Sequence, residues 1–326
     1  MILYSVIIPA YNAEGTIGKC LNALEKQNIH KEDYEVIVVD DGSTDRTPEI
    51  IKPFPVKYLH QQNKGPASAR NRGAREAKGE IILFTDADCV PQESWIKEMT
   101  IPFKNPEVIA VKGAYKTNQK SLTARFAQAE FEERFEMLKK ADSIDMVDTY
   151  SAAFRKPAFL SFGGFDPSFP VANNEDTELS YKMSRAGCKM VFNPAAIVFH
   201  LKHPDTITKY ATLKFWRGYW RIVVYKRYPD KMLKDSYTPQ TLKLQIISLL
   251  LLLTCLPLIW LQPRLMSYFF IVVIVLFMLS SLPFTMLAAK NDLTVAVLSP
   301  FFLSVRAASL GLGAVFGVLT GKTGAK

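Results

Sequence analysis

Short apolar runs alternate with segments of helical periodicity over the first 200 residues of this 326-residue chain. Continuous apolar runs are typical of strands buried on both faces of a sheet, and the segments between them space their apolar residues as one face of a helix does. The alternation predicts an α/β domain with a mostly parallel sheet covered by helices. The expected strands are residues 5–9, 35–39, 56–60 and 80–84, and the expected helices are 14–27, 44–52, 65–78 and 92–100.

The C-terminal part of the chain is almost entirely apolar. Residues 244–263 and 265–289 contain no charged side chain, and each run is long enough to cross a hydrocarbon core of about 30 Å as a helix. A third apolar run, residues 293–321, is interrupted by Pro300 and Arg306, and we predict that it also spans. The whole transmembrane region is therefore expected over residues 244–322.

Glycines recur every four residues in the third apolar run, at Gly313, Gly317 and Gly321. Residues at this spacing share one face of a helix, and the missing side chains allow a second helix to approach closely. We expect this face to be a helix-packing surface.

The net charge of +9 is unevenly distributed along the chain. Residues 1–199 have a balance of −2, whereas residues 200–243 have a balance of +7, which argues against a nucleic-acid-binding N-terminal domain. Residues 203–243 contain Trp and Tyr side chains among their Lys and Arg side chains. This mixture predicts amphipathic helices at a membrane surface or, alternatively, helices packed on the N-terminal domain. The positive-inside rule places residues 1–202 on the cytoplasmic side of a cell membrane that the chain crosses more than once.

Polar residues follow directly after the expected strands, at the edge where parallel sheets bind ligands. Asp40 and Asp41 end the second strand, where they could accept hydrogen bonds from a nucleobase and a ribose. The alternative is local, because Ser43, Thr44 or Asp45 could cap the next helix. Lys64 and Arg70, at the start of the third helix, could hold a phosphate or a base.

The last expected strand ends in Thr85-Asp86-Ala87-Asp88. If this segment is extended, Asp86 and Asp88 point the same way and can converge on one Mg²⁺ or Mn²⁺ ion. His200 ends another apolar run and is either a third metal ligand or a structural histidine.

A pair of acids, Glu175-Asp176, follows the glycine turn at Gly163-Gly164. An acid at the start of a helix is favoured by the helix dipole, which is a structural explanation. The catalytic alternative is that Asp176 is a general base, which accepts the proton of an attacking hydroxyl.

Taken in order, residues 6–12, 39–45, 85–88 and 163–166 with Glu175-Asp176 resemble the family-2 inverting glycosyltransferases. The resemblance covers residues 4–200 and implies a Rossmann-like GT-A catalytic domain, which we place at residues 1–202. It implies that Asp86 and Asp88 hold Mn²⁺ or Mg²⁺ on the diphosphate and that Asp176 is the catalytic base. It also implies a set of residues that contact the nucleotide-sugar. That set is Pro9, Ala10, Tyr11, Asp40, Asp41, Lys64, Arg70, Asp86 and Glu175.

These features together predict a membrane-anchored enzyme. It would move a sugar from a UDP- or GDP-type donor to a lipid or a lipid-linked saccharide at the cytoplasmic face. The Gln-x-x-Arg-Trp motif typical of processive synthases is absent, which argues against polymer synthesis. A nucleotidyltransferase and a non-catalytic membrane scaffold are the alternatives; the first usually has a glycine-rich loop after strand one, where this chain has Pro9-Ala10-Tyr11-Asn12.

Overall fold

A computed structural model describes residues 2–169 and 174–320 of the chain. The chain divides into two compact units. The first, which we call the sheet unit, comprises Met1–Asn118 and Phe135–His203; the second, the helical unit, comprises Gln119–Arg134 and Pro204–Lys326. Residues 119–134 thus belong to the helical unit, although in sequence they fall within residues 1–202.

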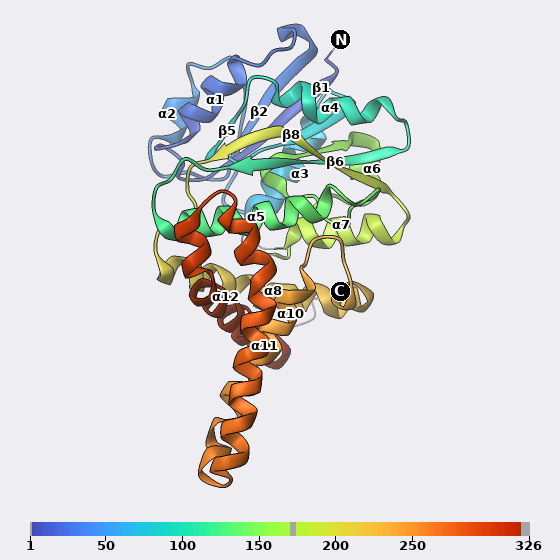
Figure 1. Ribbon diagram of the computed structural model, residues 1–326. Helices are drawn as coiled ribbons and strands as arrows, with labels where there is room; N and C mark the ends of the chain where they lie inside the picture. Colours follow the sequence, from blue (N-terminus) through green and yellow to red (C-terminus); the bar gives the residue numbers. More distant parts are fainter. Residues whose placement is uncertain (1, 170–173, 321–326) are drawn as a thin grey trace. The chain divides into compact units, whose positions relative to one another are not determined.

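The sheet unit is built on one eight-stranded sheet in the order β3-β2-β1-β4-β7-β6-β8-β5 (Figure 1). Its strands are β1 (Tyr4–Ala10), β2 (Tyr34–Asp40), β3 (Lys57–His60), β4 (Ile81–Phe84), β5 (Cys89–Pro91), β6 (Val108–Lys116), β7 (Ala152–Arg155) and β8 (Lys189–His200). Its helices are α1 (Ile17–Glu25), η1 (Lys31–Asp33), α2 (Thr47–Ile51), α3 (Pro66–Glu76), α4 (Trp95–Thr100), η2 (Ile101–Lys104), η3 (Thr149–Ser151), α6 (Lys156–Ser161) and α7 (Glu175–Arg185).

The four expected strands form the parallel half of this sheet, β3-β2-β1-β4. The apolar residues of β1, β2 and β4 are mostly buried because helices such as α3 pack on the sheet, and Val6, Ile7 and Ile8 of β1 have no exposed surface. The prediction of a mostly parallel sheet is confirmed. The other half is mixed: β7 runs antiparallel to β4 and β6, and β5 antiparallel to β8, while β6 and β8 are parallel.

The helical unit contains α5 (Leu122–Leu138), whose residues from Phe135 onward belong to the sheet unit, and the C-terminal helices. These are α8 (Ile207–Arg227), α9 (Pro229–Leu233), α10 (Gln240–Cys255), η4 (Leu256–Trp260), α11 (Pro263–Ala289) and α12 (Leu293–Thr320). Three helical segments are long and apolar enough to cross a membrane, namely Gln240–Trp260, Pro263–Ala289 and Leu293–Thr320. These match the three predicted spans closely, and Pro300 does not end the third helix.

The glycine face of α12 packs against α8. A Cβ atom added to Gly313 would collide with the carbonyl oxygen of Phe215, and one added to Gly317 would lie 2.8 Å from the carbonyl oxygen of Tyr219. The predicted close-packing surface is therefore confirmed for these two glycines, whereas Gly321 lies outside the described residues. Helix α8 lies along this face of α12. Its aromatic residues Phe215 and Tyr219 therefore also contact Phe316 of α12, at ring-centroid distances of 5.9 and 5.7 Å.

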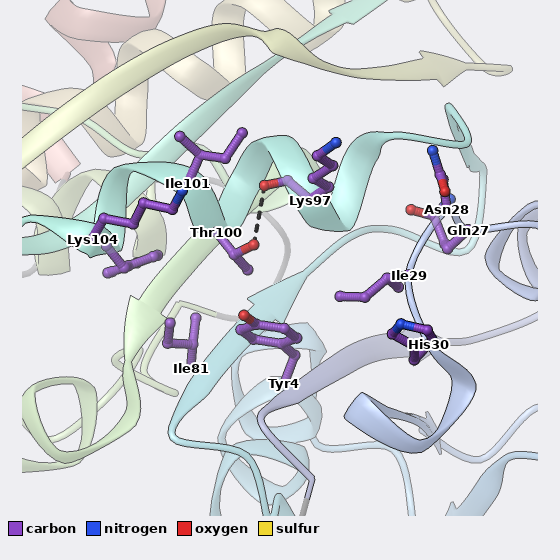
Figure 2. Close-up of a pocket in the computed structure, with 11 residues that line it drawn as sticks. Tyr4, Gln27, Asn28, Ile29, His30, Ile81, Lys97, Thr100, Ile101 and Lys104 are labelled. Carbon is purple, nitrogen blue, oxygen red and sulfur yellow. Dashed lines mark hydrogen bonds between the residues drawn. The ribbon is translucent and has the colours of Figure 1, made fainter.

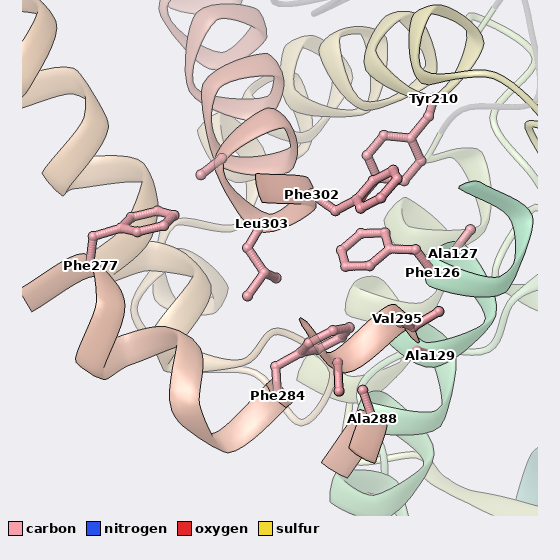
Figure 3. Close-up of a cluster of buried hydrophobic side chains, with 12 residues drawn as sticks. Phe126, Ala127, Ala129, Tyr210, Phe277, Phe284, Ala288, Val295, Phe302 and Leu303 are labelled. Carbon is pink, nitrogen blue, oxygen red and sulfur yellow. The ribbon is translucent and has the colours of Figure 1, made fainter. Parts of the chain in front are cut away.

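Aromatic rings form the centre of the helical unit (Figure 3). Phe126 of α5 stacks on Phe302 of α12 at 4.8 Å, and it also contacts Tyr210 of α8 and Phe284 of α11 at 5.7 and 5.2 Å. One ring therefore touches three other helices, which explains why the start of α5 belongs to this unit.

A buried polar cluster, which we call the Glu130 cluster, lies in the same unit. Glu130 of α5 has no exposed surface and accepts hydrogen bonds from Tyr210, Lys214 and Arg306, at 2.8, 3.0 and 3.3 Å. Arg306 also donates to Gln245 of α10 at 2.8 Å. The charge of Arg306, which interrupts the third apolar run in the sequence, is thus neutralised by a carboxylate of α5.

Candidate active site

The first acid at the end of β2, Asp40, is held by its own surroundings. Its Oδ1 accepts the backbone N–H of Ser43 at 2.9 Å, and its Oδ2 accepts the hydroxyl of Tyr58 at 2.6 Å. The ring of His60 lies 3.2 Å from the same Oδ2. Burial opposes ionisation, but these hydrogen bonds outweigh it and lower the pKa of Asp40. Asp40 is therefore a buried, charged group that fixes the loop after β2.

The second acid, Asp41, organises the loop that leads into α3. It accepts the backbone N–H groups of Lys64 and Gly65, at 2.9 and 2.8 Å, and the side-chain amide of Gln61 at 2.8 Å. Gly65 has a φ of 85°, a conformation that glycine adopts without strain. Lys64 thus contributes its backbone to this loop, while its side chain is exposed.

The loops after β1 and β2 are joined to each other. Asn12 accepts the N–H of Thr44 at 2.9 Å, and its own N–H donates to Ser43 at 3.0 Å. Helix α2 begins at Thr47, later than expected, and its N-cap residue is Arg46. Asp45, the residue before this cap, accepts the backbone N–H of Thr47 at 3.0 Å. At the end of β1, next to these two loops, Pro9 is half-buried and Ala10 is buried. Tyr11 is 52% exposed, so its ring is available to a ligand at this edge.

Arg70 of α3 connects two of the motifs. Its guanidinium donates to Asp86 at 2.7 Å and to Glu175 at 2.9 Å, and the side chain is only 2% exposed. A buried guanidinium that is paired with two carboxylates holds both in a fixed position. The structure therefore places Arg70 between the acids of the site, with two of its nitrogens already occupied.

The segment after β4 differs from the prediction. We expected residues 85–88 to be extended, so that Asp86 and Asp88 would point the same way. Strand β4 ends at Phe84, and the chain then turns, with the N–H of Cys89 donating to the carbonyl of Asp86 at 3.0 Å. A turn does not alternate its side chains as a strand does, and Asp86 instead points to Arg70.

Asp88 lies beside His200 because β5 pairs with β8. In this pairing Cys89 is opposite His200, and His200 Nε2 lies 3.8 Å from Asp88 Oδ2. Within residues 2–169 and 174–320, ligand atoms of Asp88, Cys89 and His200 lie within 4.8 Å of one another, and Asp86 does not belong to this group. Burial raises the pKa of the Cys89 thiol well above its ordinary value. Sulfur is also a soft ligand, which Mn²⁺ and Mg²⁺ do not favour. The remaining candidate ligands are the carboxylate of Asp88 and the imidazole of His200, a pair that suits Mn²⁺.

The two acids at the start of α7 have different environments. Glu175 is 2% exposed and pairs with Arg70. Burial raises its pKa to about 7, the charge of Asp176 acts in the same direction, and Arg70 opposes both. Asp176 is partly exposed and accepts the N–H of Thr177 at 2.7 Å. Of the two, Asp176 has the carboxylate that an outside group can reach.

Asn71, which the sequence analysis did not single out, fastens the glycine turn to α3. Its side-chain amide donates to the carbonyl of Phe165 at 2.7 Å, and its oxygen accepts the N–H of Phe165 at 2.9 Å. Gly163 and Gly164 both have positive φ, at 88° and 69°, but only Gly164 lies against Asn71. The turn needs glycine at 164 for two reasons, backbone conformation and space.

We expect Gly164→Ala to destabilise the protein more than Gly163→Ala. Both changes force alanine into a left-handed conformation, which costs about 1–2 kcal/mol. Only at Gly164 would the new Cβ collide with Asn71, so that two hydrogen bonds worth about 1 kcal/mol each are also disturbed. Thermal unfolding of the two variants tests this, and equal midpoints would contradict the role given to Asn71.

The sequence analysis missed Tyr58, His60, Gln61, Asn71 and Cys89. Only the position of His60 and Gln61 at the end of a strand could have identified them, because the contacts of all five depend on neighbours distant in sequence. The structure brings together the acids of two predicted motifs around Arg70, and it joins Asp88 to His200.

Part of the chain matches a known protein family. Residues 5–162 match the profile of Glycosyl transferase family 2. The chain carries a family-2 glycosyltransferase domain. The domain contains the loops of Asp40, Asp41, Arg70, Asp86 and Asp88, whereas Glu175-Asp176 and His200 follow it in the chain.

Several relatives of this glycosyltransferase domain have names. The probable glycosyltransferase YdaM of Bacillus subtilis is 30% identical over 234 residues, covering 67% of this chain and 52% of that protein. Glycosyltransferase AglE of Haloferax volcanii is 42% identical over 99 residues, covering 28% of this chain and 33% of the relative. The chain thus spans between about a third and a half of the length of these two relatives.

A solved structure confirms the GT-A type of fold. The mannosyltransferase PcManGT of Pyrobaculum calidifontis, solved with GDP-mannose and Mn²⁺, matches with a TM-score of 0.63 at 19% identity. The match covers 98% of this chain and 88% of that one. It supports the predicted Rossmann-like sheet followed by helices.

Proposed function

We propose that this protein is a membrane-anchored, inverting glycosyltransferase. It transfers a sugar from a UDP- or GDP-type donor to a hydroxyl of a lipid or a lipid-linked saccharide at the cytoplasmic face of the cell membrane. The observation that carries the proposal is the gathering of Asp86, Glu175 and the neighbouring Asp176 around Arg70, at the ligand-binding edge of a family-2 domain. The donor class is supported by the fold relative solved with GDP-mannose.

The chemistry follows from the environments of the acids. The acceptor oxygen attacks the anomeric carbon, the bond from that carbon to the diphosphate breaks, and the diphosphate leaves with the electron pair. Asp176 takes the proton of the acceptor hydroxyl, since its carboxylate is partly exposed. Arg70 and Glu175 are positioning residues, because Arg70 holds Asp86 and Glu175 together next to this carboxylate.

The nucleotide part of the donor is expected at the loops after β1 and β2. Tyr11 offers an exposed ring, and the Asp40 and Asp41 loops form the adjoining wall. Lys64 extends an exposed ammonium at the same edge, where it can reach a phosphate.

A divalent cation, Mn²⁺ or Mg²⁺, would be held by Asp88 and His200. When bound, it supplies positive charge that stabilises the departing diphosphate. Asp86 is engaged by Arg70, and we assign it to the wall of the site beside the ion rather than to the cluster of Asp88 and His200.

The membrane assignment rests on the helical unit. Its three candidate spans, Gln240–Trp260, Pro263–Ala289 and Leu293–Thr320, indicate membrane association, and the excess of Lys and Arg in residues 200–243 favours a cytoplasmic sheet unit. Large side chains on these helices are exposed, such as Tyr268 at 72% and Leu265 at 62%. An acceptor that carries a lipid would be concentrated at this surface.

A screen of nucleotide-sugars against the full chain in detergent tests the proposal. A UDP- or GDP-sugar should raise the thermal unfolding temperature in the presence of Mn²⁺ and should be hydrolysed slowly. If no nucleotide-sugar did either, the glycosyltransferase proposal would be wrong and a scaffold role would gain support.

We expect Asp88→Asn to abolish metal-dependent donor binding. The neutral amide is a much weaker ligand for a divalent cation than the carboxylate is. The measurement is donor affinity with Mn²⁺ and with EDTA: the ratio should be large in the wild type and near one in the variant. Cys89→Ala is the matched control, because its thiol lies in the same cluster but is a soft ligand that Mn²⁺ and Mg²⁺ do not favour. A variant Asp88→Asn with an unchanged ratio would overturn the metal assignment.

A further inference from the structure

A second concave site lies in the sheet unit, away from the candidate active site. It is a cavity of about 720 Å³ beside the first residues of β1 and β4, represented by Tyr4 and Ile81 (Figure 2). Its other walls are the segment after α1, which includes Asn28, Ile29 and His30, and the helices α4 and η2. Because β1 and β4 run parallel, their first residues are at the opposite edge from the acids of the active site.

The lining of this cavity is cationic and contains no acid. The charged residues of its lining are Lys97 and Lys104, and none of its lining residues is Asp or Glu. Both lysines are exposed, and within the described parts of the chain neither ammonium has a hydrogen-bond or ion-pair partner. Lysine ammonium groups without a neighbouring carboxylate favour an anionic ligand such as a phosphate.

The floor of the cavity is apolar and aromatic. Ile29 and Ile81 are half-buried, and Phe103 is buried. In Figure 2 the ring of Tyr4 lies between the side chains of Ile29 and Ile81. Such a surface packs against the C–H groups of a sugar or a polyol, while its rim contacts their polar groups. The combination fits a ligand that is rich in hydroxyls and carries phosphates.

The walls are fixed in place without a ligand. Gln27 donates to the carbonyl of Gln92 at 2.8 Å and accepts the N–H of Ile96 at 2.9 Å. The N–H of Asn28 donates to the carbonyl of Glu93 at 2.7 Å. These bonds tie the segment after α1 to the start of α4, so binding would not need to order this part of the cavity.

We propose that the cavity is a second, non-catalytic site, which binds a phosphate-bearing polyol or glycan chain as a remote part of the acceptor. The proposal rests on the proposed glycosyltransferase function and adds a class of acceptor to it. The seven residues of β1, at about 3.3 Å each, separate the two sites by roughly 20 Å. Only an extended chain of several repeating units can occupy both, so the site would distinguish long acceptors from short ones.

A binding experiment with the full chain in neutral detergent tests this. The probe is a fluorescent glycerol-phosphate oligomer of about twelve units, with a neutral malto-oligosaccharide of the same length for comparison. We expect the phosphate oligomer to bind and Lys97→Gln/Lys104→Gln to weaken its binding about tenfold or more, since two charge-assisted contacts are lost. Lys52→Gln/Lys78→Gln removes two exposed lysines outside the cavity and should change binding less than about twofold.

Each other outcome overturns the proposal in a defined way. Equal losses in the two double variants would show that only overall charge matters. Equal binding of the neutral oligosaccharide would refute the role of the phosphates. Displacement of the oligomer by inorganic phosphate at the same concentration of phosphate groups would indicate a site for single anions and not for a chain.

The proposal and the glycosyltransferase function can fail separately. The stabilisation of the same preparations by a nucleotide-sugar with Mn²⁺ reports on the active site alone. If that stabilisation is present and oligomer binding is absent, the cavity proposal is wrong while the proposed function stands. If the nucleotide-sugar has no effect but the oligomer binds, the proposed function is the one that fails.

Discussion

Asp176→Asn should remove sugar transfer while donor binding stays close to that of the wild type. The amide has nearly the shape of the carboxylate but cannot accept the proton of the acceptor hydroxyl, and a general base of this kind contributes about 10²–10⁴-fold to the rate. Glu175 cannot replace it, since its carboxylate is buried against Arg70. The measurement is the turnover rate with saturating donor, together with donor affinity from thermal stabilisation.

A control variant separates this effect from a general loss of activity. Asp142→Asn makes the same chemical change at an exposed position outside the active site and should leave turnover unchanged. Turnover within about tenfold of the wild type in Asp176→Asn would show that another group accepts the proton. Loss of donor binding in this variant would indicate that Asp176 holds the donor instead.

The sequence predicts the parallel half of the sheet well for a physical reason. Strands β1, β2 and β4 are largely buried on both faces, so their apolar runs are continuous, and polar residues follow directly where each run ends. The order of residues along the chain therefore suffices to place Asp40, Asp41 and Asp86 at one edge of the sheet. It does not identify their partners, since Tyr58 reaches Asp40 only through the pairing of β2 with β3.

The other half of the site depends on contacts that leave no local pattern. Asp88 and His200 meet because the three-residue strand β5 pairs with the end of β8, and so short a strand has no recognisable period. Arg70 shares the buried face of α3 with Ala67 and Ala74, but its sequence neighbours do not reveal the carboxylate that pairs with it there, which is Glu175 of α7. Two charged residues that attract each other across 105 positions cannot be paired from sequence alone.

The same limit applies to the helical unit. Arg306 interrupts an apolar run, and the sequence offers no counter-ion within the C-terminal 83 residues except Asp292. Asp292 pairs with Arg125 instead, at 2.6 Å, and the counter-ion of Arg306 is Glu130. Both partners come from α5, a helix far away in the chain. The third apolar helix therefore depends on a carboxylate that lies outside the apolar region.

Glu130→Gln should be the most destabilising of the substitutions considered for the helical unit. Burial alone would raise the pKa of Glu130, but Lys214, Arg306 and Arg134 outweigh it and lower the pKa to about 2, so the group is ionised. Its replacement by an amide leaves the buried cations Lys214 and Arg306 without this counter-charge, and removing one partner of such a buried network costs about 3–5 kcal/mol. A clear fall in the unfolding midpoint of the full chain in detergent is the expected result.

Two further variants are compared with Glu130→Gln by their loss of stability. Arg306→Met should cost less than Glu130→Gln, because Glu130 would keep its contacts with Lys214 and Tyr210 while the new side chain remains apolar. Glu136→Gln removes a carboxylate from the same helix, but that group is half exposed and pairs with an exposed lysine, so its loss should cost at most about 1 kcal/mol. If Glu130→Gln lowered the midpoint no more than Glu136→Gln, the Glu130 cluster would not stabilise the unit. If instead Arg306→Met lowered the unfolding midpoint more than Glu130→Gln, the stability of the cluster would depend on Arg306 more than on Glu130.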